Sequence, residues 1–245
     1  MCDDLSPERL AAALPARELR SYPAVLSTEA DALAWARTGA PAGAVVVADY
    51  QASPRGRGGR PWQVMPGVGL AFSLILRPRL APARDGWLYV VALCAIADVL
   101  GPDARFEWPD EARVGEQRAA AVGVQADLGP PGPPWAVVSV IVDGARPPRA
   151  PLLGRVVEAI EARDRSPAAA LLNDYSARCA TLGRAVRARL LPLGPAGGEV
   201  TGTAVAVLKD GALVVATADA RRVAVPPHVL AVLEDAGAPA APPPG

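Results

Sequence analysis

The segment 50–62 constrains the fold more than any other stretch of the chain. It reads Tyr-Gln-Ala-Ser-Pro-Arg-Gly-Arg-Gly-Gly-Arg-Pro-Trp. Apolar runs at 44–48 and 68–76 lead into it and out of it. Because glycine and proline both disfavour the interiors of helices and strands, the segment predicts a loop that joins two strands.

The same loop carries an excess of positive charge. From 50 to 84 the chain has six arginines and no acidic residue, although its formal net charge is zero. Glycines let backbone N–H groups approach an anion, and guanidinium groups pair with phosphate or carboxylate. The pattern indicates a site for a small anionic ligand. A solvated, flexible loop is the alternative, because short glycine-rich patterns often occur without a ligand.

Size and composition narrow the classes of protein that this chain can be. Its 245 residues are 51% hydrophobic, enough for one large domain or for one domain with a smaller one beside it. The zero net charge disfavours a nucleic-acid partner, since nucleic-acid-binding domains are usually basic. Three widely spaced cysteines predict neither a disulfide framework nor a metal site.

The sequence shows no targeting or membrane-spanning segment. The N-terminus, Met-Cys-Asp-Asp, is acidic and lacks the apolar stretch of a signal peptide. The longest apolar run, 87–100, contains Asp98 and is too short to span a bilayer. We therefore expect a soluble, cytoplasmic protein with no membrane partner.

Sequence patterns predict a mixture of helices and strands up to residue 182. Ser27-Thr28-Glu29 is typical of a helix N-cap, and Gly39 ends the helix that follows. The run at 87–100 predicts a helix buried in the core. Further helices are expected at 152–163 and 167–182, and strands at 44–49, 69–77, 104–108, 119–128 and 135–142.

The C-terminal part of the chain has a different pattern. Short strands are predicted at 185–191, 199–208, 212–218 and 221–225, with tight turns at 209–211 and 219–220. Together they predict a small β-barrel-like module. The tail, 236–245, is rich in proline and alanine and is expected to be disordered.

At 50–62 the sequence resembles the biotin protein ligase family. That family's signature is a Gln, then Gly-Arg-Gly-Arg-x-Gly-Arg, then one residue and a Trp. Pro54 stands at the position of the first Gly. The residues that match in register are Gln51, Arg55, Gly56, Arg57, Gly59, Arg60 and Trp62.

Further motifs continue the resemblance in the family's order over roughly residues 21 to 233. Ser27-Thr28 matches the Ser-Thr that opens the family's first helix. The segment 107–111, Glu-Trp-Pro-Asp-Glu, stands where the family has Lys-Trp-Pro-Asn-Asp. The segment 118–125 occupies the place of Lys-Leu-Ala-Gly-Ile-Leu-Val-Glu, and 181–186 looks like the linker into the family's small C-terminal domain.

The resemblance implies an α+β fold of the class II synthetase-like biotin/lipoate ligase type. It has a mixed, largely antiparallel sheet with helices, followed by a small SH3-like β-barrel. The implied units are an N-terminal extension at 1–20, a catalytic domain at 21–182, the SH3-like domain at 183–235 and the disordered tail at 236–245. Since no helix-turn-helix unit precedes the catalytic domain, the resemblance implies a monofunctional ligase, not a DNA-binding repressor.

The family joins biotin to ATP, forms biotinyl-5'-AMP and transfers biotin to a lysine of a carrier domain. The resemblance therefore implies a ligase that uses biotin, ATP and Mg²⁺, with the biotin carboxyl carrier domain of an acyl-CoA carboxylase as partner. The implied catalytic residues are Arg118 and Arg57. The implied biotin-binding residues are Ser27, Thr28, Gln51, Arg55, Gly56 and Arg57. The implied adenylate- and phosphate-binding residues are Arg55, Arg57, Gly59, Arg60, Trp62, Asp110 and Arg118.

Several positions depart from the family pattern. The family's two lysines and its Asn-Asp pair are replaced by Glu107, Arg118 and Asp110-Glu111. Glycines of the family's Gly-x-Gly-x-Asn and Ala-Gly-Ile motifs are replaced by Ser139, Ile141 and Ala121. The side chains of Ala121 and Ile141 can fill the pocket. Two alternatives stay open: a catalytically impaired member that binds a ligand or carrier, and a lipoate-type acyl ligase. The oligomeric state is open as well.

Overall fold

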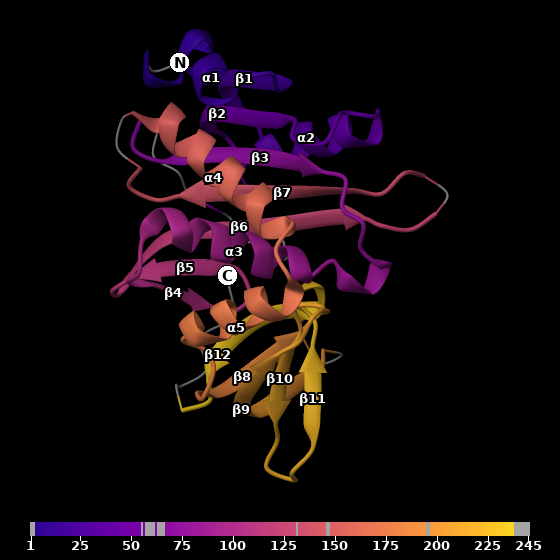
Figure 1. Cartoon of the computed structure of the whole chain (residues 1–245). Helices are drawn as coiled ribbons and strands as arrows, with labels where there is room; N and C mark the ends of the chain where they lie inside the picture. Colours follow the sequence, from indigo (N-terminus) through magenta and orange to yellow (C-terminus); the bar gives the residue numbers. More distant parts are fainter. Residues whose placement is uncertain are drawn as a thin grey trace.

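The computed structural model describes residues 3–54, 56, 62, 67–130, 132–145, 148–194 and 197–237. Within these ranges the chain forms two β-sheets with helices packed against them (Figure 1). Most of the predicted tail lies outside the described residues. None of the helices in the described ranges is both long and apolar enough to cross a membrane.

The larger sheet has seven strands in the order β1-β2-β3-β7-β6-β5-β4. Strands β1 and β2 are parallel, and every other neighbouring pair is antiparallel. The predicted mixed, largely antiparallel sheet is therefore confirmed. The strands are β1 (Leu19–Val25), β2 (Val45–Gln51), β3 (Leu70–Leu76), β4 (Ala104–Glu107), β5 (Glu111–Val114), β6 (Gln117–Asp127) and β7 (Trp135–Val142).

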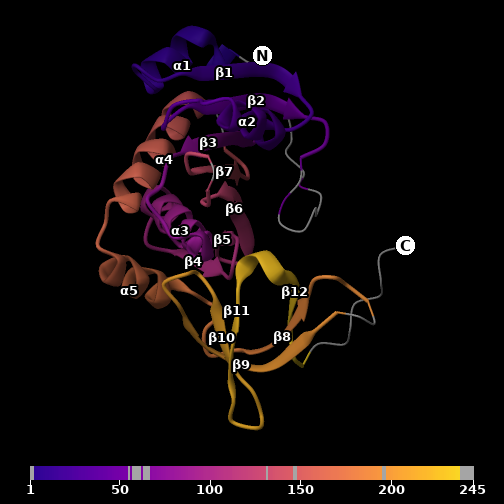
Figure 2. The same cartoon turned by 90° about the vertical axis from the view of Figure 1, so that its right-hand side faces the viewer.

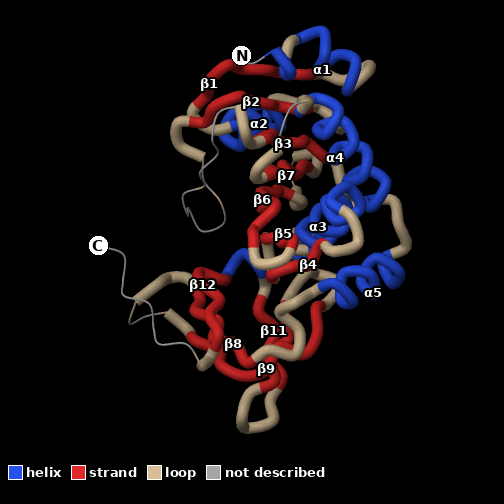
Figure 3. The backbone as a smooth tube through the Cα atoms, turned by 90° about the vertical axis from the view of Figure 1, so that its left-hand side faces the viewer, coloured by secondary structure: helices blue, strands red, loops and turns tan. Residues whose placement is uncertain are grey.

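Helices cover both faces of this sheet (Figure 2). Helices α1 (Pro7–Ala13), α3 (Trp87–Leu100) and α4 (Arg149–Asp164) lie on one face and form a column beside it (Figure 3). Helix α2 (Thr28–Arg37) packs on the other face, against β2, β3 and β7. Helix α3 is buried from Trp87 through Ala97, as its apolar sequence predicts.

A second sheet follows α5 (Ala168–Arg178) and has five antiparallel strands in the order β11-β10-β9-β8-β12. This arrangement fits the small β-barrel that the sequence predicts. Its strands are β8 (Ala185–Leu190), β9 (Glu199–Val207), β10 (Leu213–Ala216), β11 (Arg222–Val225) and β12 (Leu230–Asp235).

Three strands have no counterpart among those that the sequence predicts: β1, β5 and β12. Strand β1 lies at the sheet edge, where Pro23 is tolerated because an edge strand needs fewer N–H donors. Strand β5 has only four residues, two of them charged. Pairing with neighbouring strands stabilises these segments, and local composition does not reveal it.

Candidate functional site

Two rows of small or apolar residues cross the larger sheet on the face that α2 covers. Strands β3, β7 and β6 each contribute one residue to the first row and one to the second, because the strand registers align these positions. All six residues are buried. The first row is Ser73, Ser139 and Gly123, and the second is Ala71, Ile141 and Ala121.

A buried hydrogen-bond network links the start of α2 to the first row. Thr28 donates to Gln51 Oε1 from its backbone nitrogen (2.7 Å) and from Oγ1 (3.0 Å). Ser73 Oγ donates to Thr28 Oγ1 (3.0 Å), and Ser139 Oγ lies 2.9 Å from Ser73 Oγ. A backbone N–H can only donate, so it orients the Gln51 amide with its oxygen toward Thr28 and makes Nε2 the donor for other groups.

The start of α2 places an acidic side chain over the same row. Ser27 Oγ accepts a hydrogen bond from Ala30 N (3.4 Å), which is the predicted N-cap contact. Glu29 comes next to Thr28, and a Cβ added at Gly123 would lie 3.3 Å from Glu29 Oε2. Burial raises the pKa of Glu29 above its ordinary value, and a hydrogen bond with Ser139 opposes this rise without cancelling it.

Trp62 closes the space between α2 and the sheet. Its side chain packs on the second row, against Ala71, Ala121 and Ile141. Gly56 lies so close to the indole that any Cβ there would clash with the ring. The cavity that remains encloses about 10 Å³, enough for a single water molecule. It is lined by Ser27, Thr28, Glu29, Gln51, Pro54, Trp62, Phe72, Ser139, Val140 and Ile141.

Arg118, the predicted catalytic cation on β6, forms an ion pair with a carboxylate. Its Nε donates to Asp143 Oδ2 (2.7 Å) and its Nη2 to Oδ1 (3.4 Å). This hydrogen bonding raises the pKa of Arg118, against the opposing effect of burial, with smaller contributions from the charges of Glu111 and Asp110. The Arg118 side chain is 31% exposed, so an incoming anion can still reach it.

Glu107, at the position of the family's first lysine, faces the C-terminal sheet. Arg184 Nη1 donates to its two carboxylate oxygens, at 2.9 Å to Oε1 and 2.8 Å to Oε2. Arg184 also pairs with Asp235 on β12. The predicted phosphate-binding residue Asp110 lines an open cavity of about 570 Å³ beside this ion pair, together with Glu111. The side chain that replaces the lysine therefore joins the two sheets.

The structure brings together only part of the predicted site. Ser27, Thr28, Gln51 and Trp62 line the small cavity, and Gly56 lies against Trp62. Arg118 and Asp110 do not line it. The predicted residues Arg55, Arg57, Gly59 and Arg60 lie outside the described residues. Within the described ranges, no group of three or more His, Cys, Asp or Glu side chains is placed to hold a metal ion.

Three residues of the network carry no role in the sequence prediction: Glu29, Ser73 and Ser139. Glu29 directly follows the Ser-Thr motif, so its position near the site could have been predicted from the sequence. Ser73 and Ser139 are 66 residues apart in the sequence and meet only through strand register. The available signal was one serine inside each of two otherwise apolar strands, Leu-Ala-Phe-Ser-Leu-Ile-Leu and Trp-Ala-Val-Val-Ser-Val-Ile-Val.

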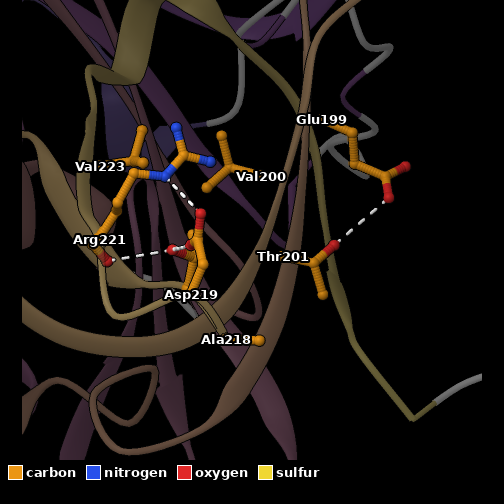
Figure 4. Close-up of a pocket in the computed structure, with 8 residues that line it drawn as sticks. Glu199, Val200, Thr201, Ala218, Asp219, Arg221 and Val223 are labelled. Carbon is orange, nitrogen blue, oxygen red and sulfur yellow. Dashed lines mark hydrogen bonds and ion pairs between the residues drawn. The ribbon is translucent and has the colours of Figure 1, made fainter.

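A further cavity, of about 570 Å³, lies on the C-terminal sheet (Figure 4). Asp219 accepts a hydrogen bond from Arg221 Nε (2.6 Å) and another from Thr217. Glu199 accepts one from Thr201 Oγ1 (3.3 Å). These polar side chains bond one another, and the cavity shares no lining residue with the one under α2.

No family model matches the chain. The chain is nevertheless similar to known proteins in sequence and to solved structures in fold. A solved structure of biotin protein ligase from Aquifex aeolicus in complex with biotin and ATP has a TM-score of 0.67. The match covers 89% of this chain and 99% of that one at 20% sequence identity, which shows the shared fold.

Two curated relatives are similar in sequence. A biotin–[acetyl-CoA-carboxylase] ligase of Paracoccus denitrificans is 35% identical over 130 residues, which are 51% of this chain and 53% of that protein. A biotin–[acetyl-CoA-carboxylase] ligase of Mycobacterium tuberculosis is 30% identical over 204 residues, which are 73% of this chain and 75% of that protein. With the shared fold and the ordered motifs, these similarities show that the chain belongs to the biotin protein ligase family.

Proposed function

We propose that this protein is an ATP-dependent biotin–protein ligase that forms biotinyl-5'-AMP and transfers biotin to a lysine of a carboxylase carrier domain. The observation that carries this proposal is the oriented amide of Gln51 in the cavity under α2. The cyclic urea of biotin has one carbonyl and two N–H groups, which all need partners once buried. Gln51 Nε2 is a donor suited to that carbonyl, and Ser27 Oγ lies on the same cavity wall.

The first chemical step joins two anionic groups and therefore needs cations. A carboxylate oxygen of biotin would attack the α-phosphorus of ATP, and the bond to pyrophosphate would break. Arg118 is the described cation that we assign to this step, with Arg55, Arg57 and Arg60 from the loop. We expect Mg²⁺ to arrive bound to ATP, since no described cluster of carboxylates is placed to hold it.

The second step transfers the acyl group. The amine of the carrier lysine would attack the acyl carbon of biotinyl-5'-AMP, and AMP would leave with the bonding electrons. We assign the loop at 50–62 to shielding the adenylate from water, because hydrolysis competes with transfer. We further propose 21–182 as the catalytic domain and 183–235 as an SH3-like domain, with 1–20 as an extension. Residues Leu5 and Leu10 of that extension are buried in the main core.

A second candidate is a family member that binds a ligand or a carrier with little turnover. The observation in its favour is the occupied pocket: Ile141 and Trp62 leave only about 10 Å³ beside Gln51. The pairing of Arg118 with Asp143 points the same way. The loss of a well-placed cation typically lowers a rate by about 10²–10³.

A direct assay separates the two candidates. The protein is incubated with biotin, Mg²⁺-ATP and a carboxylase carrier domain, and biotinylated carrier and pyrophosphate are both measured. A ligase yields both products in equal amounts, and Arg118→Ala lowers both rates. Arg155→Ala, an exposed position on α4, is the matched control and should leave the rates unchanged. A folded protein that binds biotin and yields neither product supports the second candidate.

A further inference from the structure

A row of three arginines crosses the outer strands of the larger sheet. Strands β6, β5 and β4 lie side by side at one end of that sheet (Figure 1). Arg113 on β5 pairs in register with Arg118 on β6 and with Arg105 on β4. Directly opposite residues of antiparallel strands point to the same face, with Cβ atoms roughly 4.5–5.5 Å apart. The three side chains therefore start side by side on one face of the sheet.

This face is the one that carries the small cavity under α2. Ala112, next to Arg113, is buried in the main core with α3, on the opposite face. Glu111 lies opposite Ala121, which belongs to the second row of the cavity floor. Because successive residues of a strand alternate between faces, Glu111 and Arg113 share the face of Ala121. The arginine row thus runs outward from the predicted catalytic cation to the edge of the sheet.

A register shift brings Arg118 into this row. Ala112 pairs with Ala120, so regular pairing would bring Ala119 opposite Arg113. The shift between Ala112 and Arg113 instead places Arg118 there. β-Bulges of this kind re-aim side chains and are frequent beside functional sites. Two like charges directly opposite each other destabilise a sheet, and an anion bound by both guanidinium groups would remove that repulsion.

We propose that Arg113 binds the β- and γ-phosphates of ATP and stabilises the leaving pyrophosphate. In the proposed first step a carboxylate oxygen of biotin bonds to the α-phosphorus. The bond from that phosphorus to the oxygen of the β-phosphate breaks, and pyrophosphate leaves with the electron pair. Since Arg118 is the cation assigned to the reacting groups, the arginine one strand further out is placed for the leaving group. This inference rests on the proposed ligase function and adds a residue that lies in none of the motifs of the family resemblance.

Arg113 has both the room and the donors to bind such an anion. It lines the open cavity of about 570 Å³ beside the contact of the two sheets, and its side chain is 31% exposed. Its Nη1 lies 3.6 Å from Glu111 Oε2, which is longer than an ordinary hydrogen bond, and its Nη2 donates to the carbonyl of Glu116. Since a guanidinium carries five N–H donors, these contacts leave others that can donate to phosphate.

The carboxylates of the same cavity set the competition that an anion meets. They are Glu107, Asp110, Glu111 and Glu116. Arg184 bonds both carboxylate oxygens of Glu107 (2.9 and 2.8 Å), so that charge is balanced by a different cation. Glu111 is the carboxylate paired with Arg113 itself. A phosphate must therefore displace Glu111 from Arg113, and removal of the Glu111 charge should strengthen anion binding.

Inorganic pyrophosphate is the probe for this site, and calorimetric titration measures its affinity. Arg113→Ala should bind it about tenfold to a hundredfold more weakly than the wild type, since charge-assisted hydrogen bonds to phosphate are lost. Arg113→Lys should recover part of this loss, because lysine keeps the charge without the planar fork. Glu111→Gln should bind pyrophosphate severalfold more tightly, and this gain should vanish when Arg113→Ala is added.

Arg105→Ala is the matched control in the same row. The Arg105 guanidinium donates to the carbonyls of Pro102 (2.8 Å) and Ala104 (3.0 Å) and does not line the cavity. Its removal lowers the charge of the row as much as Arg113→Ala does. The affinity for pyrophosphate should nevertheless stay at the wild-type value.

Adenylate formation tests the role of Arg113 in the reaction. Arg113→Ala should raise the KM for ATP about tenfold or more and slow single-turnover formation of biotinyl-5'-AMP, since the leaving group loses its cation. Its affinity for biotin should stay unchanged, because biotin binds under α2. A merely structural role would instead weaken biotin binding and ATP binding together.

The outcomes distinguish this inference from the function on which it rests. If the wild type forms the adenylate and a folded Arg113→Ala keeps its pyrophosphate affinity and its KM for ATP, the role of Arg113 is overturned and the ligase function stands. A wild type that binds no pyrophosphate, or an equal loss in Arg105→Ala, overturns that role as well. Binding of pyrophosphate through Arg113 without any adenylate overturns the ligase function and leaves an anion site.

Discussion

At the scale of single residues, the ion pair between Arg118 and Asp143 bears most directly on the proposed reaction. The resemblance places a lysine and an asparagine at these two positions, so the family pair carries one positive charge where this pair carries none. A carboxylate 2.7 Å from the guanidinium reduces its attraction for an incoming phosphate. Arg118 keeps the positive charge of the family's lysine, but Asp143 neutralises part of the electric field of that charge before any substrate binds.

Removing the negative charge should therefore increase activity. Asp143→Asn keeps a hydrogen-bond acceptor for Arg118 and leaves the guanidinium with its full charge, so we expect biotinyl-5'-AMP formation to become severalfold faster. Arg118→Ala should slow it by about 10²–10³. Single-turnover formation of the adenylate measures both effects. If Asp143→Asn slows the reaction as much as Arg118→Ala does, then Asp143 positions the cation and does not weaken it.

A second residue-scale feature is a fully buried arginine at the start of α4. The Arg149 guanidinium is 0% exposed, bonds both carboxylate oxygens of Asp4 (2.9 and 2.8 Å) and pairs with Asp49 (2.8 Å). It also donates to the carbonyl of Gly69 (3.0 Å). One cation thus connects the N-terminal segment, the end of β2 and the residue before β3.

Breaking this pair should be costly because it leaves buried carboxylates without a cation. Arg149→Met should lower the free energy of unfolding by about 3–5 kcal/mol in urea denaturation. Arg155→Met, further along the same helix and exposed, is the control and should change it by less than about 0.5 kcal/mol. A loss no larger than that of the control would show that water or neighbouring groups compensate the two acids.

The same pair predicts acid sensitivity. Hydrogen bonding from Arg149 lowers the pKa of Asp4 below its ordinary value of 3.8. A depressed carboxyl pKa contributes stability that is present above the ordinary value and is lost as the pH falls through the folded-state pKa. Asp4→Asn should therefore be less stable than the wild type at neutral pH, and the two should converge in acid. Urea denaturation at a series of acidic pH values measures this, and parallel curves would exclude the effect.

Some of these residues could be predicted from the sequence and others could not, for a physical reason. Thr28 and Gln51 stand in short local motifs, so their spacing shows in the sequence. Arg149 and Asp4 are 145 residues apart, and only the packed fold brings them together. Long-range polar pairs of this kind leave no periodic or local signal.

At the scale of elements, β7 decides how much room the pocket has. Ile141 lines the small cavity and packs against Trp62, at a position where the family pattern has glycine. Val137 lies on the same face of β7, packs beneath α2 and does not line the cavity. The two residues therefore form a matched pair for truncation.

Truncating the Ile141 side chain should lower the stability of the protein and raise its affinity for biotin. Ile141→Ala should lower the free energy of unfolding by about 2–4 kcal/mol, since it removes buried carbon atoms, and should raise the affinity for biotin because the cavity grows. Val137→Ala should also destabilise the protein and leave biotin affinity unchanged. Unfolding curves and biotin titration of both variants measure the exchange. Unchanged affinity in Ile141→Ala would show that Ile141 does not obstruct the ligand.

The elements themselves were largely predictable. Helices α2 and α3 follow from an N-cap motif and a continuous apolar run, which are local signals. Strands β2, β3 and β7 follow from their apolar composition. Short edge strands such as β1 depend on pairing that the sequence does not display.

At the scale of the whole molecule, the contact between the two sheets uses Glu107, the residue at the position where the resemblance places a lysine. Trp108 Nε1 donates to the carbonyl of Gly211 (2.9 Å), and Gly211 approaches Gly86 so closely that any Cβ would clash with its backbone. Glu107 and Arg184 add an ion pair to this contact. The charge reversal at Glu107 was visible in the sequence, but its partner was not, because the contact forms only when the C-terminal sheet packs against β4.

Replacing Glu107 by lysine should therefore weaken the contact between the two sheets and leave adenylate formation no faster. Glu107→Lys would place a second cation beside Arg184 and should lower the free energy of unfolding by about 1–2 kcal/mol, from a lost, partly exposed ion pair and a new repulsion. Glu116→Lys, in the same cavity but not bonded to Arg184, is the control and should be within about 0.5 kcal/mol of the wild type. Urea denaturation and adenylate formation are measured on both variants. If Glu107→Lys forms the adenylate faster at unchanged stability, then that position serves the reaction, and the ion pair with Arg184 is dispensable to the contact between the sheets.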